Sequence, residues 1–237
     1  MTYSYICKIG DREINEDAAV CLKRDGCYCF VVADGLGWHG GGEVASRILI
    51  ETFEREFRSV DESNSAFLSR AFDIAQEEIA SSKKKADEMK TTGVALSILG
   101  GRFCWAHVGD SRIYYFHKGK FRNRTLDHSV PQMLAISGAI SDSEISHHPD
   151  RNKLFRALGD EWDNPRYEIS KERRLSKGDA FLLCSDGFWE HIPEHMMIEK
   201  LRGSKSADEW LSAMRTDVEI NASGHIMDNY TAITVMF

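Results

Sequence analysis

The chain has 237 residues, a formal net charge of -7, and a composition that is 42% hydrophobic and 28% charged. This length can bury a sizeable core, and the composition is ordinary for a soluble globular protein. The acidic excess excludes nucleic acid as the main partner, because a phosphate backbone requires a basic binding surface.

In the first third of the chain, three short apolar runs are followed by two amphipathic segments. Strands are predicted at residues 3–7, 18–22 and 28–33, followed by a glycine-rich turn. Helices are predicted over about 42–57 and 65–81, because apolar residues recur there at three- and four-residue spacing. The inward faces would consist of Ala45, Ile48, Leu49, Thr52, Phe53 and Phe57 in the first helix and Phe67, Leu68, Ala71, Phe72, Ala75 and Ile79 in the second.

The rest of the chain groups its strands and its helices. Strands are predicted at 92–99, 102–108, 112–116 and 120–123, with hairpin turns at Gly100-Gly101 and Lys118-Gly119. Short helices follow at 128–137 and 142–147, strands at 167–170 and 180–184, helices at 193–201 and 207–220, and a last strand at 231–236. Meandering strands with paired helices indicate α+β layers rather than β-α-β units. We expect one domain over residues 1–237.

Nothing in the sequence resembles a targeting or membrane segment. The N-terminus is charged from residue 8, and no apolar run approaches the roughly 18 residues that span a bilayer. The six cysteines show no spacing suited to zinc or to a disulfide scaffold, so we expect reduced thiols. We therefore expect a cytoplasmic protein with no membrane partner.

Acidic residues lie at the ends of several predicted strands that are far apart in the chain. They are Glu16, Asp17, Asp34, Asp110, Asp186 and Asp228, and all of them except Asp17 adjoin Gly, Ser or Asn. If these strand ends converge, the carboxylates repel one another unless cations lie between them. Hard oxygen ligands suit Mg²⁺ or Mn²⁺. Asp-Gly is also a common turn dipeptide, and we expect Asp25-Gly26 to be only a turn. A set of acidic strand ends as large as this one instead indicates a metal site.

The chemistry of such a site would be hydrolytic. Two divalent ions can hold a water between them, lower its pKa and bind phosphoryl oxygens, which requires no cysteine nucleophile. A phosphate also needs a cation that can bind it through two hydrogen bonds, and Arg12 lies just before Glu16. The chain contains no Cys-x5-Arg loop of the kind that thiol phosphatases use.

A second motif fits a dinucleotide-binding fingerprint. Residues 35–40 match G-x-G-x-x-G between a strand and a helix. We reject this interpretation because Asp34 would place a carboxylate where a pyrophosphate should bind. The elements that follow are also helices and hairpins rather than a parallel repeat.

The ordered motifs resemble those of the metal-dependent (type 2C, PPM) serine/threonine phosphatases in their compact bacterial form. The motifs are Arg12-x-x-Asn15-Glu16-Asp17, residues 34–46 (DGLGWHGGGEVAS), Gly109-Asp-Ser-Arg112, Leu126-Asp-His-Ser129, Leu154-Phe-Arg-Ala-Leu-Gly159, Cys184-Ser-Asp-Gly187 and Asp228-Asn229. The resemblance runs from about residue 4 to 236. It implies a four-layer α-β-β-α fold with a central antiparallel β-sandwich flanked by helix pairs.

The resemblance also implies roles for individual residues. Asp34 would bridge two Mn²⁺ or Mg²⁺ ions, Asp186 and Asp228 would complete one site, and the Gly35 carbonyl, with Glu16 through water, would complete the other. Asp110 would hold a third, weaker ion together with Asp186. Arg12 would bind the phosphate, and residues 126–158 would form a mobile flap that shapes substrate access.

Some positions depart from the family pattern. Leu36 stands where some members carry a histidine proposed as general acid, so we expect a metal-bound water to protonate the leaving group. Trp38 is bulky for its loop, His39 fits a histidine of the bacterial loop, and Lys90 stands where the family usually has glycine. No metal ligand is lost, so we expect an active enzyme.

The resemblance predicts a monomeric signalling phosphatase whose substrate is a phosphorylated protein, the product of a serine/threonine kinase. A narrow regulatory partner, as in anti-sigma pathways, is one version of this function. A catalytically silent module that only binds phosphoproteins is an alternative from a different class.

Overall fold

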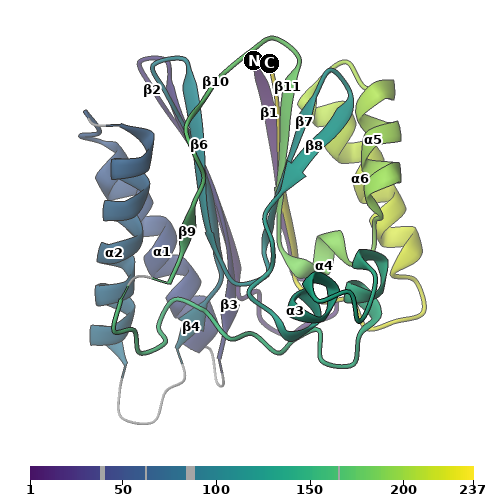
Figure 1. The fold of residues 1–237 in the computed structure, drawn as a ribbon, viewed down its shortest axis with the longest axis horizontal. Helices are drawn as coiled ribbons and strands as arrows, with labels where there is room; N and C mark the ends of the chain where they lie inside the picture. The colour runs from purple at the N-terminus through teal and green to yellow at the C-terminus, as the bar shows by residue number, and fades with distance from the viewer. Residues whose placement is uncertain (38–40, 62, 84–88, 165) are drawn as a thin grey trace.

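The computed structural model describes residues 1–37, 41–61, 63–83, 89–164 and 166–237. Trp38 and His39 lie outside the described residues. Two antiparallel sheets pack face to face at the centre of the molecule (Figure 1). Both chain termini lie at the same end of this sandwich.

The first sheet has five strands in the order β1-β12-β11-β7-β8. Their bounds are β1 Thr2–Lys8, β7 Arg112–His117, β8 Lys120–Arg124, β11 Asp179–Cys184 and β12 Tyr230–Met236. The two chain ends thus pair in one sheet, since β1 is hydrogen-bonded to β12 from Thr2 opposite Met236 to Lys8 opposite Tyr230.

The second sheet has seven strands, with β10-β6-β5-β3-β2 as its main order, β4 paired to β3, and β9 paired to β6. Its strands are β2 Asp17–Arg24, β3 Cys27–Leu36, β4 Lys90–Thr91, β5 Gly93–Leu99, β6 Arg102–Val108, β9 Glu168–Ile169 and β10 Arg173–Arg174. The predicted strand 92–99 is observed as β5, which begins one residue later, at Gly93. Thr92, whose backbone N–H donates to the Asp34 carbonyl at 2.8 Å, separates β5 from the unexpected short strand β4, which pairs with the end of β3.

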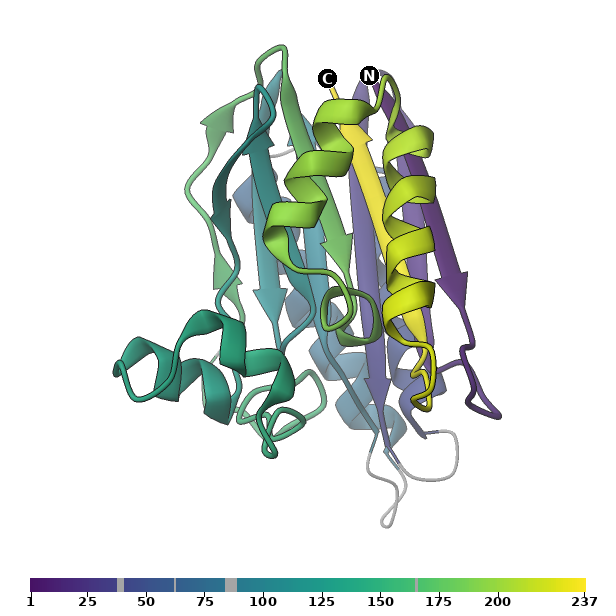
Figure 2. The same ribbon diagram turned by 90° about the vertical axis from the view of Figure 1, so that its right-hand side faces the viewer.

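Helices cover the outer face of each sheet. Helices α1 (Gly41–Phe57) and α2 (Asn64–Ser82) lie on the second sheet, and α5 (Glu194–Gly203) and α6 (Ala207–Asn221) lie on the first (Figure 1). Figure 2 shows α3 (Val130–Ile136) and the 3₁₀ helix η1 (Asp142–His147) beside the strand ends opposite the termini. Both belong to residues 126–158, which we call the flap.

Three apolar cores separate the four layers. One lies between α1, α2 and the second sheet, one between the two sheets, and one between the first sheet and α5 and α6. The predicted inward faces of the first two helices are confirmed, although Ile48 is only partly buried. The expected α+β four-layer sandwich is therefore confirmed.

Several short elements were not expected. A four-residue helix, α4 (Asp186–Trp189), begins at the acidic residue that follows β11, and β10 is a two-residue strand. Elements this short carry too few residues for a periodic signal. The predicted turns at Asp25-Gly26, Gly100-Gly101 and Lys118-Gly119 all have positive φ, as two-residue hairpin loops require.

All six cysteines are free thiols, as expected. Among the described residues, no helix combines the length and the apolar composition that crossing a bilayer demands.

Candidate metal centre

The site residues predicted from the sequence lie around one cavity of about 560 Å³. Its lining includes Arg12, Glu16, Asp34, Gly35, Asp110, Asp186 and Asp228. These residues come from both sheets and from loops far apart in the chain. The structure therefore brings the whole predicted set together, while the role of each member stays a prediction.

Asp34 and Gly35 lie near the end of β3, where the backbone is held on both sides. The Asp34 carbonyl accepts hydrogen bonds from the Thr91 hydroxyl at 3.0 Å and from the Thr92 N–H at 2.8 Å. The Gly35 N–H donates to the Glu16 carbonyl at 3.1 Å. A side chain on Gly35 would run into the Gly42 carbonyl at the start of α1, so this position requires glycine.

Asn229 acts as a clamp on the loop that carries Arg12 and Glu16. Its side-chain oxygen accepts from the Glu16 N–H at 2.8 Å, and its amide nitrogen donates to the carbonyls of Ile9 and Ile14 at 2.8 and 3.1 Å. No role for Asn229 was predicted from the sequence. Its position beside Asp228 was the available signal, but its three partners lie more than 200 residues away.

Asp228 connects the predicted phosphate-binding residue to the acidic cluster. Its Oδ2 accepts from Arg12 Nη2 at 2.6 Å, and its Oδ1 accepts from the Asn229 N–H at 2.8 Å. The Arg12 side chain is 54% exposed, so it faces the open side of the cavity. This bond raises the pKa of Arg12 and keeps its guanidinium charged.

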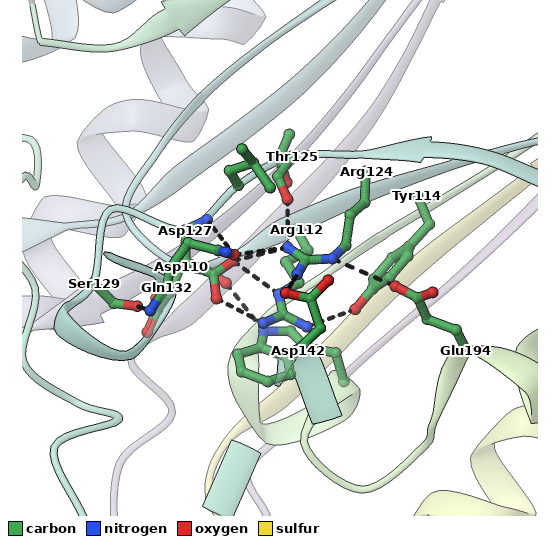
Figure 3. Close-up of polar contacts among 12 residues, drawn as sticks. Asp110, Arg112, Tyr114, Arg124, Thr125, Asp127, Ser129, Gln132, Asp142 and Glu194 are labelled. Carbon is green, nitrogen blue, oxygen red and sulfur yellow. Dashed lines mark hydrogen bonds and ion pairs between the residues drawn. The ribbon is translucent and has the colours of Figure 1, made fainter. Parts of the chain in front are cut away.

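Asp110 follows β6 and is held by a buried aromatic side chain. The Trp189 indole N–H donates to the Asp110 carbonyl at 3.0 Å. The Arg112 guanidinium stacks on the same indole at 3.4 Å and binds both carboxylate oxygens of Asp127 at 2.8 and 2.6 Å. Figure 3 shows this network between Asp110 and the first residues of the flap.

A second buried arginine continues the network toward the flap helices. Arg124 donates to the side-chain oxygen of Gln132 at 3.0 Å and lies 3.5 Å from Asp142 and 3.4 Å from Glu194 (Figure 3). It thereby connects β8 to α3, η1 and the start of α5. Arg112 and Asp127 each belong to a motif recognised in the sequence, but their pairing was not predicted.

Burial and mutual repulsion dominate the electrostatics of the cavity. Burial, followed by the charge of Asp186, raises the pKa of Asp34 and of Asp110 well above the ordinary value for a carboxyl group. Burial, then the charge of Asp228, raises the pKa of Asp186, and burial raises the pKa of Glu16.

Asp17 extends the acidic cluster below the cavity. Its Oδ2 accepts from the Ser185 hydroxyl at 2.7 Å, while Oδ1 is buried without a hydrogen-bond partner among the described residues. Burial raises the pKa of Asp17 to about 7. Carboxylates packed this closely without a compensating cation fit a site for divalent ions, because such ions supply the charge that protons otherwise provide. The all-oxygen donor set suits Mn²⁺ or Mg²⁺.

A separate group, outside the acidic cavity, also has metal-ligand composition. Donor atoms of His107, His128 and Glu168 all lie within 4.8 Å of one another. His107 Nε2 bonds the Leu126 carbonyl at 2.9 Å, and His128 Nδ1 accepts from the Gly109 N–H at 3.1 Å. The second bond places the His128 proton on Nε2, which faces Glu168 at 3.3 Å. These bonds connect β6 and β9 to the first residues of the flap, so the group supports the flap.

Comparison with known proteins places the chain in a family. The family described as Protein phosphatase 2C matches residues 8–223. The "Serine/threonine phosphatase stp" of Listeria monocytogenes is 31% identical over 234 residues, which cover 94% of this chain and 90% of that protein. The "Serine/threonine protein phosphatase PstP" of Mycobacterium tuberculosis is 30% identical over 228 residues, which cover 94% of this chain and 42% of that protein.

Solved structures give the same result. The crystal structure of the Mycobacterium tuberculosis phosphatase PstP/Ppp has a TM-score of 0.83 and 28% identity, and covers 98% of this chain and 96% of that one. A PstP catalytic domain solved in complex with two manganese ions has a TM-score of 0.81 and 25% identity, and covers 98% of this chain and 96% of that one. The expected family and enzyme class, a protein phosphatase, are confirmed. The chain belongs to the protein phosphatase 2C family.

Proposed function

We propose that this protein hydrolyses phosphoserine and phosphothreonine esters in proteins, using divalent ions held by the acidic cavity. The observation that carries the proposal is the convergence of Asp34, Asp110, Asp186 and Asp228 on one cavity that also contains Arg12. The burial of these carboxyls beside one another, which raises the pKa values of Asp34, Asp110 and Asp186, supports the proposal, because buried carboxylates repel one another unless a cation lies between them.

The cation-binding residues would divide into two sets around Asp34. Asp34, Asp186 and Asp228 would hold one ion, and Asp34, the Gly35 carbonyl and, through water, Glu16 would hold the other. Asp110 with Asp186 would offer a third, weaker site. When bound, a pair of such ions supplies the charge that activates a water and neutralises phosphoryl oxygens.

Arg12 would hold the phosphate in place. It contacts Asp228 through Nη2, and a guanidinium carries five N–H donors, so donors remain for two phosphate oxygens. The bond to Asp228 fixes the guanidinium beside the acidic residues before substrate arrives. The attacking water and the phosphorus would then be positioned by groups that need not reorganise.

Leu36 also lines the cavity, next to Gly35. An alkyl side chain has no proton to give, so Leu36 cannot protonate the leaving oxygen of serine or threonine.

The substrate would be a phosphoprotein, the product of a serine/threonine kinase, and the enzyme would act as a monomer.

The test is phosphate release from a phosphothreonine peptide, with Mn²⁺ and with a chelator. We expect release by the wild type only with Mn²⁺, and a loss of roughly 100-fold or more for Asp186→Asn, since a lost metal ligand costs several kcal/mol of transition-state stabilisation. Asp208→Asn is the control, because Asp208 lies on α6, where it accepts a bond from Ser4.

Each other outcome has a defined meaning. Mn²⁺ binding without release by the wild type would favour the silent phosphoprotein-binding module. Release that persists in chelator would show that the metal-site assignment is wrong.

A further inference from the structure

The metal cavity opens into a second cavity of about 390 Å³ that has no role in the proposed chemistry. The two cavities share four lining residues, Leu36, Gly37, Asn152 and Leu154. The second cavity therefore begins where the predicted metal ligands end. It lies between the end of β3 and the last part of the flap, directly beside the metal cavity.

Cross-strand pairing places Lys90 at this second cavity. In the ladder between β3 and β4, Leu36 lies opposite Lys90, and Gly35 lies opposite Thr91. Thr91 in turn forms a bridge with Leu158 at the end of the flap. Leu36 and Lys90 both depart from the pattern of the family, and the register makes them neighbours on one wall.

Asp160, the ion-pair partner of Lys90, is held in place by further hydrogen bonds. Lys90 Nζ lies 2.9 Å from Asp160 Oδ1, while Asp160 Oδ2 accepts from the Ala157 N–H at 3.0 Å. The Asp160 carbonyl accepts from Gln76 Nε2 at 2.7 Å, which anchors the loop to α2. Both carboxylate oxygens of Asp160 therefore have a partner within the protein.

Lys90 keeps capacity for a further partner. An ammonium has three N–H donors, and Asp160 takes one of them. The Lys90 side chain is 36% exposed, so its remaining donors can be reached from solvent. Leu36, Leu154 and Phe155 add apolar side chains to a lining whose exposed surface is mostly polar, and Phe155 is 39% exposed.

We infer that this cavity is a substrate subsite for an acidic side chain flanking the phosphorylated residue, and that Lys90 selects it. The inference rests on the proposed function. The stem of a glutamate or aspartate would pack on Leu36 and Leu154, and its carboxylate would accept from Lys90. A lysine or arginine at the same place would face the exposed ammonium of Lys90 and find no free acceptor on Asp160, since both carboxylate oxygens of Asp160 already have partners in the protein.

The test compares phosphothreonine peptides that differ at one flanking position. Glutamate or lysine is placed at each of the three positions on either side of phosphothreonine, and kcat/KM with Mn²⁺ is measured for each pair. For the wild type we expect at least one position at which glutamate is favoured over lysine by about two- to five-fold, the range of a solvent-exposed ion pair. The preference should shrink as salt is added.

Variants then assign the preference to this residue. Lys90→Glu should reverse the ratio at that position, and Lys90→Met should bring it close to one. Each ratio is measured within one variant, so a change in overall activity does not affect it. The matched control is Lys200→Glu, because Lys200 also forms a 2.9 Å ion pair, with Asp217, at similar exposure between α5 and α6.

The possible failures are distinguishable. An unchanged glutamate preference in both Lys90 variants would overturn the inference, and so would an equal shift in Lys200→Glu, which would indicate a general effect of net charge. Hydrolysis of p-nitrophenyl phosphate, which has no flanking residue, is measured with wild type and Lys200→Glu. If neither shows Mn²⁺-dependent release from any substrate, the proposed function fails, and this inference fails with it.

Discussion

Arg12 contacts the acidic cluster through one of its own nitrogen atoms, Nη2, which donates to Asp228 Oδ2 at 2.6 Å. Its predicted function depends on the geometry of the guanidinium as well as on its charge. A planar fork can bind two phosphate oxygens at once, whereas a lysine ammonium acts as a point charge. The two basic side chains are therefore not equivalent at this position.

We predict that Arg12→Ala lowers kcat/KM for a phosphothreonine peptide by about 10- to 100-fold, the value of one or two charge-assisted hydrogen bonds. Arg12→Lys should recover only part of this loss. Steady-state kinetics give the effect, and a calorimetric Mn²⁺ titration checks that metal affinity changes far less than kcat/KM. Equal activity of Arg12→Lys and wild type would contradict the two-oxygen contact.

At the scale of elements, the end of β3 and the start of α1 approach each other backbone to backbone. A Cβ added to Gly42 would lie 2.6 Å from Glu16 Oε1 and 2.6 Å from the Gly35 carbonyl carbon, closer than real side chains pack. The first turn of α1 therefore positions two of the predicted metal ligands.

We predict that Gly42→Ala lowers the free energy of unfolding by about 1–3 kcal/mol, because the methyl group overpacks the contact. Mn²⁺ affinity should fall as well, since Glu16 and the Gly35 carbonyl must shift. Gly203→Ala is the matched control, because Gly203 also lies in a helix, with no atom within 4 Å of an added Cβ. Urea unfolding and Mn²⁺ titration of both variants give the comparison, and a Gly42→Ala protein that matches Gly203→Ala in both would contradict this role.

At the scale of the whole molecule, several acidic groups from both sheets are buried against one another. A carboxyl whose pKa is raised by folding binds its proton more tightly in the folded state. Its stabilising contribution is present below the unfolded pKa, near 4, and is lost as pH rises through the folded pKa. For Asp17 this window runs from about 4 to about 7, and Asp34, Asp110 and Asp186 shift in the same direction.

We predict that, in chelator, the melting temperature of the protein falls as pH rises from 5 to 8. Mn²⁺ should raise the melting temperature more at pH 8 than at pH 5, because metal and protons compete for the same carboxylates. Calorimetric melting with Mn²⁺ and with chelator at each pH is the measurement. A Mn²⁺-induced shift that is equal at both pH values would contradict the assignment of the buried carboxylates to metal.

Much of the architecture follows from local patterns. Spacing and residue type can be read directly from the sequence. They are enough to predict the apolar stripes of α1 and α2 and the hairpin turns at Gly100-Gly101 and Lys118-Gly119. The elements that were not predicted, α4, β4 and β10, contain four, two and two residues, too few for a periodic signal.

The acidic site shows the same contrast between features that local sequence predicts and contacts that depend on the tertiary structure. The sequence by itself determined which residues line the cavity, because Asp34, Asp110, Asp186 and Asp228 mark strand ends with recognisable neighbours. Only the tertiary structure decided how they are held: the Asn229 clamp, the buried Asp17, the Arg112–Asp127 pair and the Leu36–Lys90 neighbours. Such contacts join residues far apart in the chain through sheet register and side-chain packing, and neither leaves a periodic trace in a single sequence.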